Sequence, residues 1–516
     1  MRKNTQDYIG TVFTPDKWTT WLLKKYNIIS VWLDGATVLD PTCGAGNFLE
    51  AMIFSALQRG FSNKEVPCHR LYGIDKVNIF LKEFKKRMME CYSIDFPDEN
   101  LFCSDIITDK LKLKTDILVG NPPWQNFTDL PNAYKKELKP YFLKYNLVKN
   151  KKKMLLGASR IDIAALVIAK TIRENLKENG KAVFFLPLSL FLNDGAHDTF
   201  RQIASNNDSN FSVCEIYDFA GINAFPNVQT RYGTTLFKKN LKQSFPIPFY
   251  VRKDNNWTKQ LAKPISSASE AFSVYDPEIG LTNFKKIYIS KDAKPRQGAN
   301  TCGRNKILLF SDMKKENKTL VSINSYTSDR VILPKNFLFP LIDKDCFLQN
   351  NPKPERYILL PYNQKTGKIL TKTEIQLYPE LTEYLQKNKD SLQTRKGTMI
   401  KSTIQRGLYW GLLGVGKYSF CKYKVVWKAI GAKKLRPEIF TNYEDMPWQG
   451  NQALHAYIPC KSRTMAKDIR KYLLSKPVEN YLESFKMQGT MSWLQPGKVS
   501  KVFNFEKDEQ QLFDFM

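Results

Sequence analysis

The sequence is short of histidine, paired cysteines and long apolar runs, and each shortage excludes a class of protein. Its three histidines (His69, His197 and His455) argue against a zinc site, and we expect no metal to be required. Nine cysteines without a Cys-x-x-Cys pair favour reduced thiols over a disulfide framework. No apolar run approaches the roughly 18 residues of a membrane span, and residues 1–5 lack a signal-peptide core. We therefore expect a soluble, cytoplasmic protein that does not bind a membrane.

Acidic residues are also scarce, with 50 Asp and Glu against 79 Lys and Arg, which gives a formal net charge of +29. Residues 291–516 hold 39 basic and 21 acidic residues (net +18), and residues 1–290 hold 40 and 29 (net +11). Lysine-rich solvated surfaces account for part of this excess. The remainder indicates a polyanionic partner, mainly for the C-terminal part.

The most informative motif is Asn121-Pro122-Pro123-Trp124, which ends the apolar run of residues 116–120. That run predicts a central strand. The two prolines fix φ and remove backbone donors, so the Asn121 amide and the Pro122 carbonyl are held at the C-terminal edge of a sheet beside an aromatic face. Such a corner suits a flat base that carries an amino group. The alternative is a proline-rich turn with a packed tryptophan.

Upstream, residues 38–50 predict a strand, a glycine turn and a helix with Leu49, Ile53 and Leu57 at helical spacing. Gly44 and Gly46 let a ligand approach the backbone closely. The third glycine of the dinucleotide fingerprint is missing at the required offset, which argues against NAD. Cys43 is a small residue in a tight turn.

Two acids follow later strands of the same predicted sheet. Asp75 ends the strand 71–75, where a carboxylate accepts both hydroxyls of a ribose. Asp105 and Ile106 follow the strand 101–103 and offer an acid and an apolar side chain to an adenine ring. Either acid alone is more typical of a turn or a helix cap, but in this order the motifs reinforce one another.

Taken together, these motifs resemble the gamma-class, adenine-N6-specific DNA methyltransferases of restriction-modification systems, which use S-adenosylmethionine. The resemblance covers residues 8–237. It includes residues 10–15, similar to a Thr-Pro segment that closes over the methionine moiety, and Phe225-Pro226 with residues 231–237, similar to a late-sheet motif beside the flipped base. The Asn-Pro-Pro-Trp corner alone also resembles RNA guanine and protein glutamine methyltransferases.

The resemblance implies a site for each partner of the reaction. Asn121 and Pro122 would hold the target amino group, with Trp124 and Phe225 on the two faces of the flipped base. The implied S-adenosylmethionine contacts are Thr14, Pro15, Asp40, Pro41, Cys43, Gly44, Ala45, Gly46, Asp75, Lys76, Asp105, Ile106, Asn121 and Pro123. Double-stranded DNA is the implied partner, with a cognate restriction endonuclease as a further one.

Basic residues, glycines and amide side chains are mixed without apolar periodicity in three stretches of the C-terminal part, 294–306, 394–397 and 406–411. This is typical of loops that lie along phosphates and reach base edges. The candidate DNA contacts are Lys294, Arg296, Asn300, Arg304, Asn305, Arg395, Lys396 and Arg406.

Strands alternate with helices in the first half, which predicts an α/β fold with a doubly wound, Rossmann-like and mainly parallel sheet. Strands are expected at 36–40, 70–75, 100–103, 115–120, 181–187, 212–218 and 232–237. We expect a catalytic domain over 1–245, a linker over 246–290, and a mixed α+β target-recognition domain over 291–516. The insertion 125–160 is either a lid or phosphate-contacting arm, or a solvated loop.

Two other functions stay open. The first is that of an RNA base methyltransferase. The second is that of a DNA-specificity subunit whose methyltransferase half is not catalytic. An intact Asn121, Asp75 and glycine turn weigh against the second. The sequence contains no internal repeat, nuclease motif or helicase P-loop.

Overall fold

The computed structural model describes residues 12–148, 161–193, 197–203, 211–226, 228, 230–253, 255–264, 270–278, 285–325, 329–343, 346, 352–451, 454–485 and 493–505. The chain forms two compact units, Met1–Gly280 and Leu281–Met516. Within the described ranges, no helix is long and apolar enough to cross a membrane.

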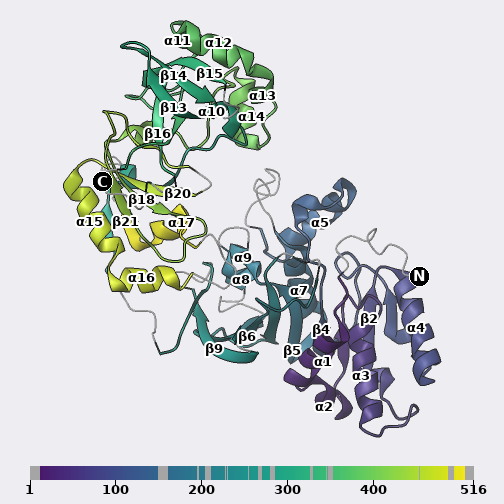
Figure 1. The fold of residues 1–516 in the computed structure, drawn as a ribbon. Coiled ribbons are helices and arrows are strands. Elements are labelled where there is room, and N and C mark those ends of the chain that lie inside the picture. Colours follow the sequence, from purple (N-terminus) through teal and green to yellow (C-terminus); the bar gives the residue numbers. More distant parts are fainter. Residues whose placement is uncertain are drawn as a thin grey trace, which may run out of the picture. The chain divides into compact units, whose positions relative to one another are not determined.

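The first unit is built on one ten-stranded sheet of order β10-β9-β8-β6-β7-β5-β4-β1-β2-β3 (Figure 1). The strands β3, β2, β1, β4 and β5 pair in parallel, and β7 lies antiparallel to both β5 and β6. This confirms the doubly wound, mainly parallel sheet. The strands are β1 (Val38–Asp40), β2 (Leu71–Asp75), β3 (Leu101–Cys103), β4 (Thr115–Gly120), β5 (Leu176–Pro187), β6 (Phe211–Asp218), β7 (Tyr232–Lys239), β8 (Ile247–Lys253), β9 (Asn256–Lys263) and β10 (Ser273–Tyr275).

Helices cover this sheet and bury their apolar sides against it. Leu49, Met52 and Ile53 of one helix are inaccessible to solvent, as the helical spacing of this segment predicts. The helices are α1 (Asp16–Lys25), α2 (Ile28–Leu33), α3 (Asn47–Gln58), α4 (Asn78–Tyr92), α5 (Asn132–Lys144), α7 (Ile163–Glu174), α8 (Ser189–Leu192) and α9 (Asp198–Ile203). Part of the insertion 125–160 therefore folds as α5, and its residues 149–160 lie outside the described residues.

The structure differs from the expected linker over 246–290, because β8, β9 and β10 extend the large sheet instead. Aromatic packing holds this extension. The rings of Tyr217 and Tyr250 stack with centroids 4.4 Å apart, and Trp257 lies 5.4 Å from Phe219. The half-exposed strand β9, which lies between β8 and the edge strand β10, lacks the alternation that marks a strand in sequence, and this is why the segment reads as a junction.

The second unit contains three sheets, of orders β15-β14-β13-β17-β16, β12-β20-β18-β19 and β11-β21. Their strands are β11 (Ile287–Ile289), β12 (Arg296–Gln297), β13 (Leu309–Lys315), β14 (Leu320–Ser325), β15 (Arg330–Pro334), β16 (Leu338–Leu341), β17 (Arg356–Leu359), β18 (Tyr423–Lys428), β19 (Glu438–Phe440), β20 (His455–Cys460) and β21 (Phe503–Phe505). The helices are α10 (Asn305–Leu308), α11 (Lys372–Gln376), α12 (Pro379–Lys387), α13 (Lys389–Gln393), α14 (Thr398–Gln405), α15 (Arg463–Leu473), α16 (Lys476–Glu483) and α17 (Pro496–Val499). This is the mixed α+β composition expected of the C-terminal part.

Candidate functional site

A cavity of about 960 Å³, partly open to solvent, lies at the C-terminal ends of β1, β2 and β4. This is the edge where ligands bind in open α/β sheets. Eleven of the expected cofactor contacts line it, namely Thr14, Asp40, Pro41, Cys43, Gly44, Asp75, Lys76, Asp105, Ile106, Asn121 and Pro123. Pro15, Ala45 and Gly46 are absent from the lining. The lining residues that the sequence did not indicate include Phe13, Asn47, Phe48, Tyr134, Ile163 and Val167.

The glycine turn forms one wall of this cavity. Gly44 and Gly46 adopt left-handed backbone conformations, with φ of +52° and +79°. A Cβ on Gly46 would lie 2.3 Å from the Phe84 ring, so the helix α4 leaves room for glycine alone. The Asn47 side chain donates to the Thr14 carbonyl at 2.9 Å and ties the N-terminal segment to the turn.

The carboxylate of Asp75 is oriented by two backbone donors. The Gly44 N–H donates to Oδ2 and the Val77 N–H to Oδ1, both at 2.9 Å. Burial raises the pKa of Asp75, and these two hydrogen bonds oppose the rise. Each carboxylate oxygen retains a further lone pair that can accept a hydrogen bond at the cavity.

Asp40 is a buried acid at the end of β1, only 1% exposed. Burial raises its pKa to about 8, despite the hydrogen bond that Oδ1 accepts from the Thr42 N–H at 3.1 Å. Burial also raises the pKa of the neighbouring Cys43 thiol, with Asp40 and Asp75 adding to the rise. A neutral, buried thiol fits the expected role of Cys43 as a small packing residue.

The pKa of Asp40 gives a testable pH dependence. The folded protein holds the Asp40 proton up to about pH 8, whereas the unfolded chain releases it near about pH 4. The free energy of unfolding therefore decreases as pH rises through this window, by up to about 1.4 kcal/mol per pH unit, and levels off above it. Asp40→Asn should remove this contribution. Its free energy of unfolding should therefore rise relative to that of wild type as pH increases from mildly acidic to mildly alkaline. Urea unfolding of both proteins without cofactor measures the difference, and equal pH profiles would contradict it.

A third acid, Asp105, is fixed by the helix α5. Its Oδ1 accepts from the Ile107 N–H at 2.8 Å, and its Oδ2 accepts from the Tyr134 hydroxyl at 2.7 Å. The Lys76 ammonium lies 4.8 Å from the centroid of the Tyr134 ring. Tyr134 therefore closes the Asp105 side of the cavity, although no motif in the insertion 125–160 marks it.

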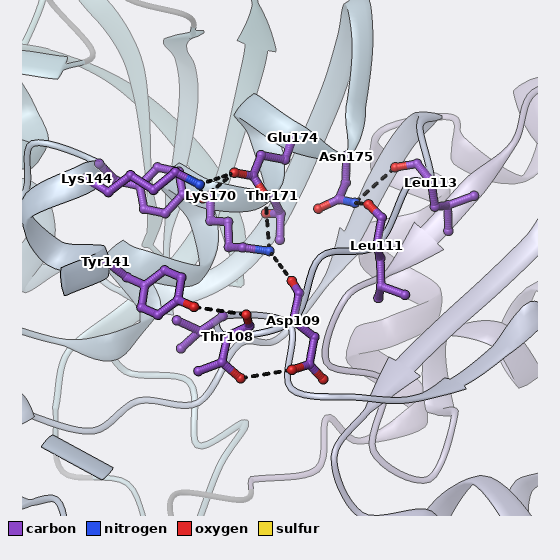
Figure 2. A network of polar contacts seen from close by, with 12 residues as sticks. Thr108, Asp109, Leu111, Leu113, Tyr141, Lys144, Lys170, Thr171, Glu174 and Asn175 are labelled. Atoms are coloured by element: carbon purple, nitrogen blue, oxygen red, sulfur yellow. Dashed lines mark hydrogen bonds and ion pairs between the residues drawn. The ribbon is translucent and has the colours of Figure 1, made fainter. Parts of the chain in front are cut away.

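Helices α5 and α7 hold the loop at Thr108 and Asp109, a few residues after Asp105 (Figure 2). The Lys170 ammonium, only 2% exposed, donates to the Asp109 carbonyl at 3.1 Å and lies 3.3 Å from Glu174. The Tyr141 hydroxyl donates to the Thr108 carbonyl at 2.9 Å. Burial acts to raise the pKa of Glu174, but hydrogen bonds from Lys144 and Tyr145 and the charge of Lys170 outweigh it and lower this pKa to about 2. Glu174 is thus a charged anchor for both helices.

The Asn121 side chain has a fixed orientation at the end of β4. Its Nδ2 donates to the Val12 carbonyl at 3.1 Å. Its Oδ1 is buried and has no hydrogen-bond partner among the described residues. Because an unpaired buried acceptor is costly, this oxygen is a candidate position for a ligand donor.

The two aromatic residues expected beside the base contact each other. The rings of Trp124 and Phe225 meet edge to face at 5.0 Å, and Tyr232 stacks on Trp124 at 5.3 Å. Phe225 is 2% exposed, so in this arrangement Trp124 and Tyr232 cover it. The fold brings Trp124 and Phe225 together but does not open a slot between them.

The candidate DNA contacts differ in the hydrogen bonds and ring contacts that their side chains make within the second unit. Arg395 is 2% exposed, and its guanidinium donates to the carbonyls of Leu392, Gly411 and Tyr409. Its proposed DNA contact is therefore corrected to a structural role, because a buried guanidinium that joins three carbonyls cannot reach a phosphate.

Other candidates also have internal partners. Arg304 donates to the Ser391 carbonyl at 2.7 Å, and Arg296 lies 4.2 Å from the Tyr418 ring centroid. The Asn300 Oδ1 accepts from the Cys302 N–H, and Lys294 lies over the Phe505 ring. Asn305 accepts from the Thr301 hydroxyl, and Arg406 reaches Thr403 at 3.5 Å. Lys396 is exposed. In the part of the chain that the structure describes, no group of three or more His, Cys, Asp or Glu could hold a metal.

The chain is similar to methyltransferases of restriction-modification systems. Residues 49–225 match the Eco57I restriction-modification methylase family. The Type II methyltransferase M.NspV of a Nostoc species is 24% identical over 452 residues, which are 80% of this chain and 82% of that protein. The Type II restriction enzyme and methyltransferase RM.Eco57I of Escherichia coli is 25% identical over 388 residues, 64% of this chain and 37% of the relative.

Among solved structures, the Type IIL restriction-modification enzyme MmeI in complex with DNA has the same fold, with a TM-score of 0.56 and 14% sequence identity. The match covers 93% of this chain and 64% of MmeI. The family match and the two relatives support a methyltransferase of the restriction-modification type.

Proposed function

We propose that this chain is a gamma-class DNA methyltransferase that transfers a methyl group from S-adenosylmethionine to the N6 amino group of adenine in double-stranded DNA. The observation that carries this proposal is the Asn121 amide. Its nitrogen is engaged by the Val12 carbonyl, so its buried oxygen is left to accept a hydrogen bond from the amino group of a base. The match to a restriction-modification methylase family supports the reaction class.

The cavity residues fit the cofactor. Asp75 would accept hydrogen bonds from the ribose hydroxyls, and Asp105 with Ile106 would lie at the adenine. The turn at Gly44, where a Cβ would approach the Phe13 ring to 3.0 Å, would lie close to the methionine portion. When bound, S-adenosylmethionine supplies an electrophilic methyl group on a positively charged sulfur.

The corner residues prepare the acceptor by position and electrostatics. An adenine amino group is a poor nucleophile, because its lone pair is delocalised into the ring. Hydrogen bonds to the Asn121 Oδ1 and the Pro122 carbonyl would draw the nitrogen toward tetrahedral geometry and localise that lone pair for in-line attack. Because the amino group of a paired base is out of reach, the target adenine would be flipped out of the duplex.

Nucleoside analysis tests this reaction against its alternatives. The purified chain, incubated with S-adenosylmethionine and mixed-sequence DNA, should produce N6-methyladenine in that DNA. Methylated cytosine, or methyl transfer to RNA alone, would overturn the adenine assignment. Cofactor binding without any transfer would favour a specificity subunit. Modification-sensitive sequencing of DNA from cells that express the chain would then give the recognition site. The sequence of this site would show whether it is one that a restriction-modification system recognises.

A prediction for Trp124 separates base flipping from chemistry. Trp124→Ala removes an aromatic face worth about 1 to 3 kcal/mol to the flipped state, so methylation of a matched duplex should fall. Activity should recover in part on a substrate whose target adenine is mispaired, because extrusion then costs less. Trp124→Phe, which retains a ring, is the control. Equal losses on matched and mispaired substrates would contradict a role in holding the flipped base.

A further inference from the structure

The second unit contains a basic groove between β18, β19 and the helix α15. Its volume, which is continuous with bulk solvent, is about 2790 Å³. Of the described residues that line it, six are basic and one, Glu438, is acidic. The basic residues are Lys353, Lys428, Lys433, Lys434, Arg436 and Arg470.

The one acid does not balance this charge. Arg470 lies 3.2 Å from the Glu438 carboxylate and also donates to the Pro437 carbonyl at 2.8 Å, so these two charges neutralise each other. Lys428, Lys434 and Arg436 are exposed, and the structure gives their side chains no ion pair with any residue it describes. The groove therefore presents several unpaired positive charges over a short stretch of chain.

The connection between β18 and β19 that carries these bases is held at three points. The Ala429 N–H donates to the Leu454 carbonyl at 2.7 Å, the Trp493 indole N–H donates to the Ala432 carbonyl at 2.8 Å, and Arg470 holds Pro437. Gly431, with φ of +69°, allows the chain to turn between the first two points. The basic side chains thus project from an anchored segment, which lowers the conformational entropy lost when a partner binds.

Among the residues that the structure describes, the groove offers charge without a fully exposed aromatic ring. Phe440 and Trp448 are 5% and 3% exposed and pack against each other at 5.6 Å. The Tyr443 ring is half-buried and packs on Trp448 at 6.1 Å. Single-stranded nucleic acid is held largely by bases stacked on open aromatic rings, whereas a duplex presents regularly spaced phosphates that need only charge.

We propose that this groove binds the phosphate backbone of duplex DNA, through Lys428, Lys434 and Arg436. The identity of the polyanion rests on the proposed function. The assignment places phosphate binding on residues that carry little sequence signal, rather than on Arg395, whose guanidinium is buried in the unit, or on Arg304, whose guanidinium is held at the surface by the Ser391 carbonyl. It also gives part of the chain's net charge of +29 a defined location.

The test compares two triple variants of the full chain that remove the same charge. The groove variant is Lys428→Gln, Lys434→Gln and Arg436→Gln. The control is Lys314→Gln, Lys315→Gln and Lys318→Gln, on exposed residues of the β13–β14 hairpin. Fluorescence anisotropy with a labelled mixed-sequence duplex is measured between about 50 and 200 mM salt, and thermal unfolding checks that both variants fold.

The groove variant should bind the duplex about 10- to 100-fold more weakly at low salt, with the slope of log Kd against log salt reduced by about 2 to 3. The control should remain close to wild type. Equal affinities of both variants and wild type would overturn the proposal, and so would an equal loss in both variants. A loss for single-stranded RNA without a loss for the duplex would also overturn it.

Failure of the groove can be told from failure of the proposed function. If wild type methylates DNA adenine and the groove variant binds like the control, the groove assignment alone is wrong. If wild type binds duplex through the groove but transfers no methyl group to DNA, the proposed reaction is wrong and the DNA surface stands.

Discussion

Asn121→Ala is expected to lower the rate of methyl transfer by about 10²- to 10³-fold or more, while the affinities for cofactor and DNA stay close to wild type. The Asn121 Oδ1 is a buried acceptor without a partner among the described residues, and in the proposed reaction it would be used most strongly as the amino nitrogen becomes tetrahedral. An interaction made mainly in the transition state raises kcat rather than ground-state binding. Single-turnover transfer, measured beside cofactor calorimetry and DNA anisotropy, separates these effects.

Two further variants sharpen this experiment. Asn63→Ala removes an exposed asparagine whose side chain only reaches the Ser93 carbonyl, and it should behave as wild type. Asn121→Asp keeps an acceptor oxygen but loses the donor to the Val12 carbonyl at 3.1 Å, so it should retain more activity than Asn121→Ala if the acceptor is what matters. Activity of Asn121→Ala near that of wild type would show that the Asn121 corner is not the acceptor site.

Asp75→Ala is expected to weaken S-adenosylmethionine binding by about 1.5 to 3 kcal/mol, roughly a 10- to 100-fold rise in Kd. The variant would lose the charge-assisted hydrogen bonds proposed between Asp75 and the ribose. It also leaves the Gly44 and Val77 N–H groups, both 2.9 Å from this carboxylate, without their acceptor. The glycine turn should therefore be less ordered before the cofactor arrives. Calorimetry gives the affinity.

Asp95→Ala is the control for Asp75. Asp95 is 79% exposed at its side chain and lies 3.7 Å from Lys85, so its removal changes the charge without touching the cavity. Thermal unfolding without cofactor shows how much of the Asp75 effect is loss of structure. An unchanged cofactor affinity in a folded Asp75→Ala protein would rule out the ribose assignment.

Much of the first unit follows from sequence because its motifs are local. The strand β1, the turn at Gly44 and Gly46, and the start of α3 lie within a few residues of one another, and each is specified by hydrophobic period or by glycine conformation. The same holds for β2 with Asp75 and for β4 with Asn121. Since parallel strands present their C-terminal ends at one edge, strand order alone predicts that these side chains share a cavity.

The orientation of the site depends on contacts between distant residues, which no local pattern encodes. Asn121 is aligned by Val12, 109 residues earlier, and Asp105 by Tyr134, 29 residues later. Lys170 supports the Asp109 carbonyl from the helix α7, 61 residues further along the chain.

The second unit shows the limit of sequence most clearly. A row of basic residues and glycines marks a basic segment, but the sequence cannot show which of the cationic side chains face solvent. Arg395 is buried where three carbonyls from two segments converge on it, whereas Lys428, Lys434 and Arg436 form no ion pair with a described residue, and Glu438 pairs with Arg470 of α15. The sequence by itself therefore determined the parallel strands of the sheet, the glycine turn, the acids at the strand ends and the Asn-Pro-Pro-Trp corner, each set by neighbours along the chain. Only the tertiary structure decided which polar groups are buried and engaged and which are left for a partner, because burial and pairing depend on residues that meet through folding.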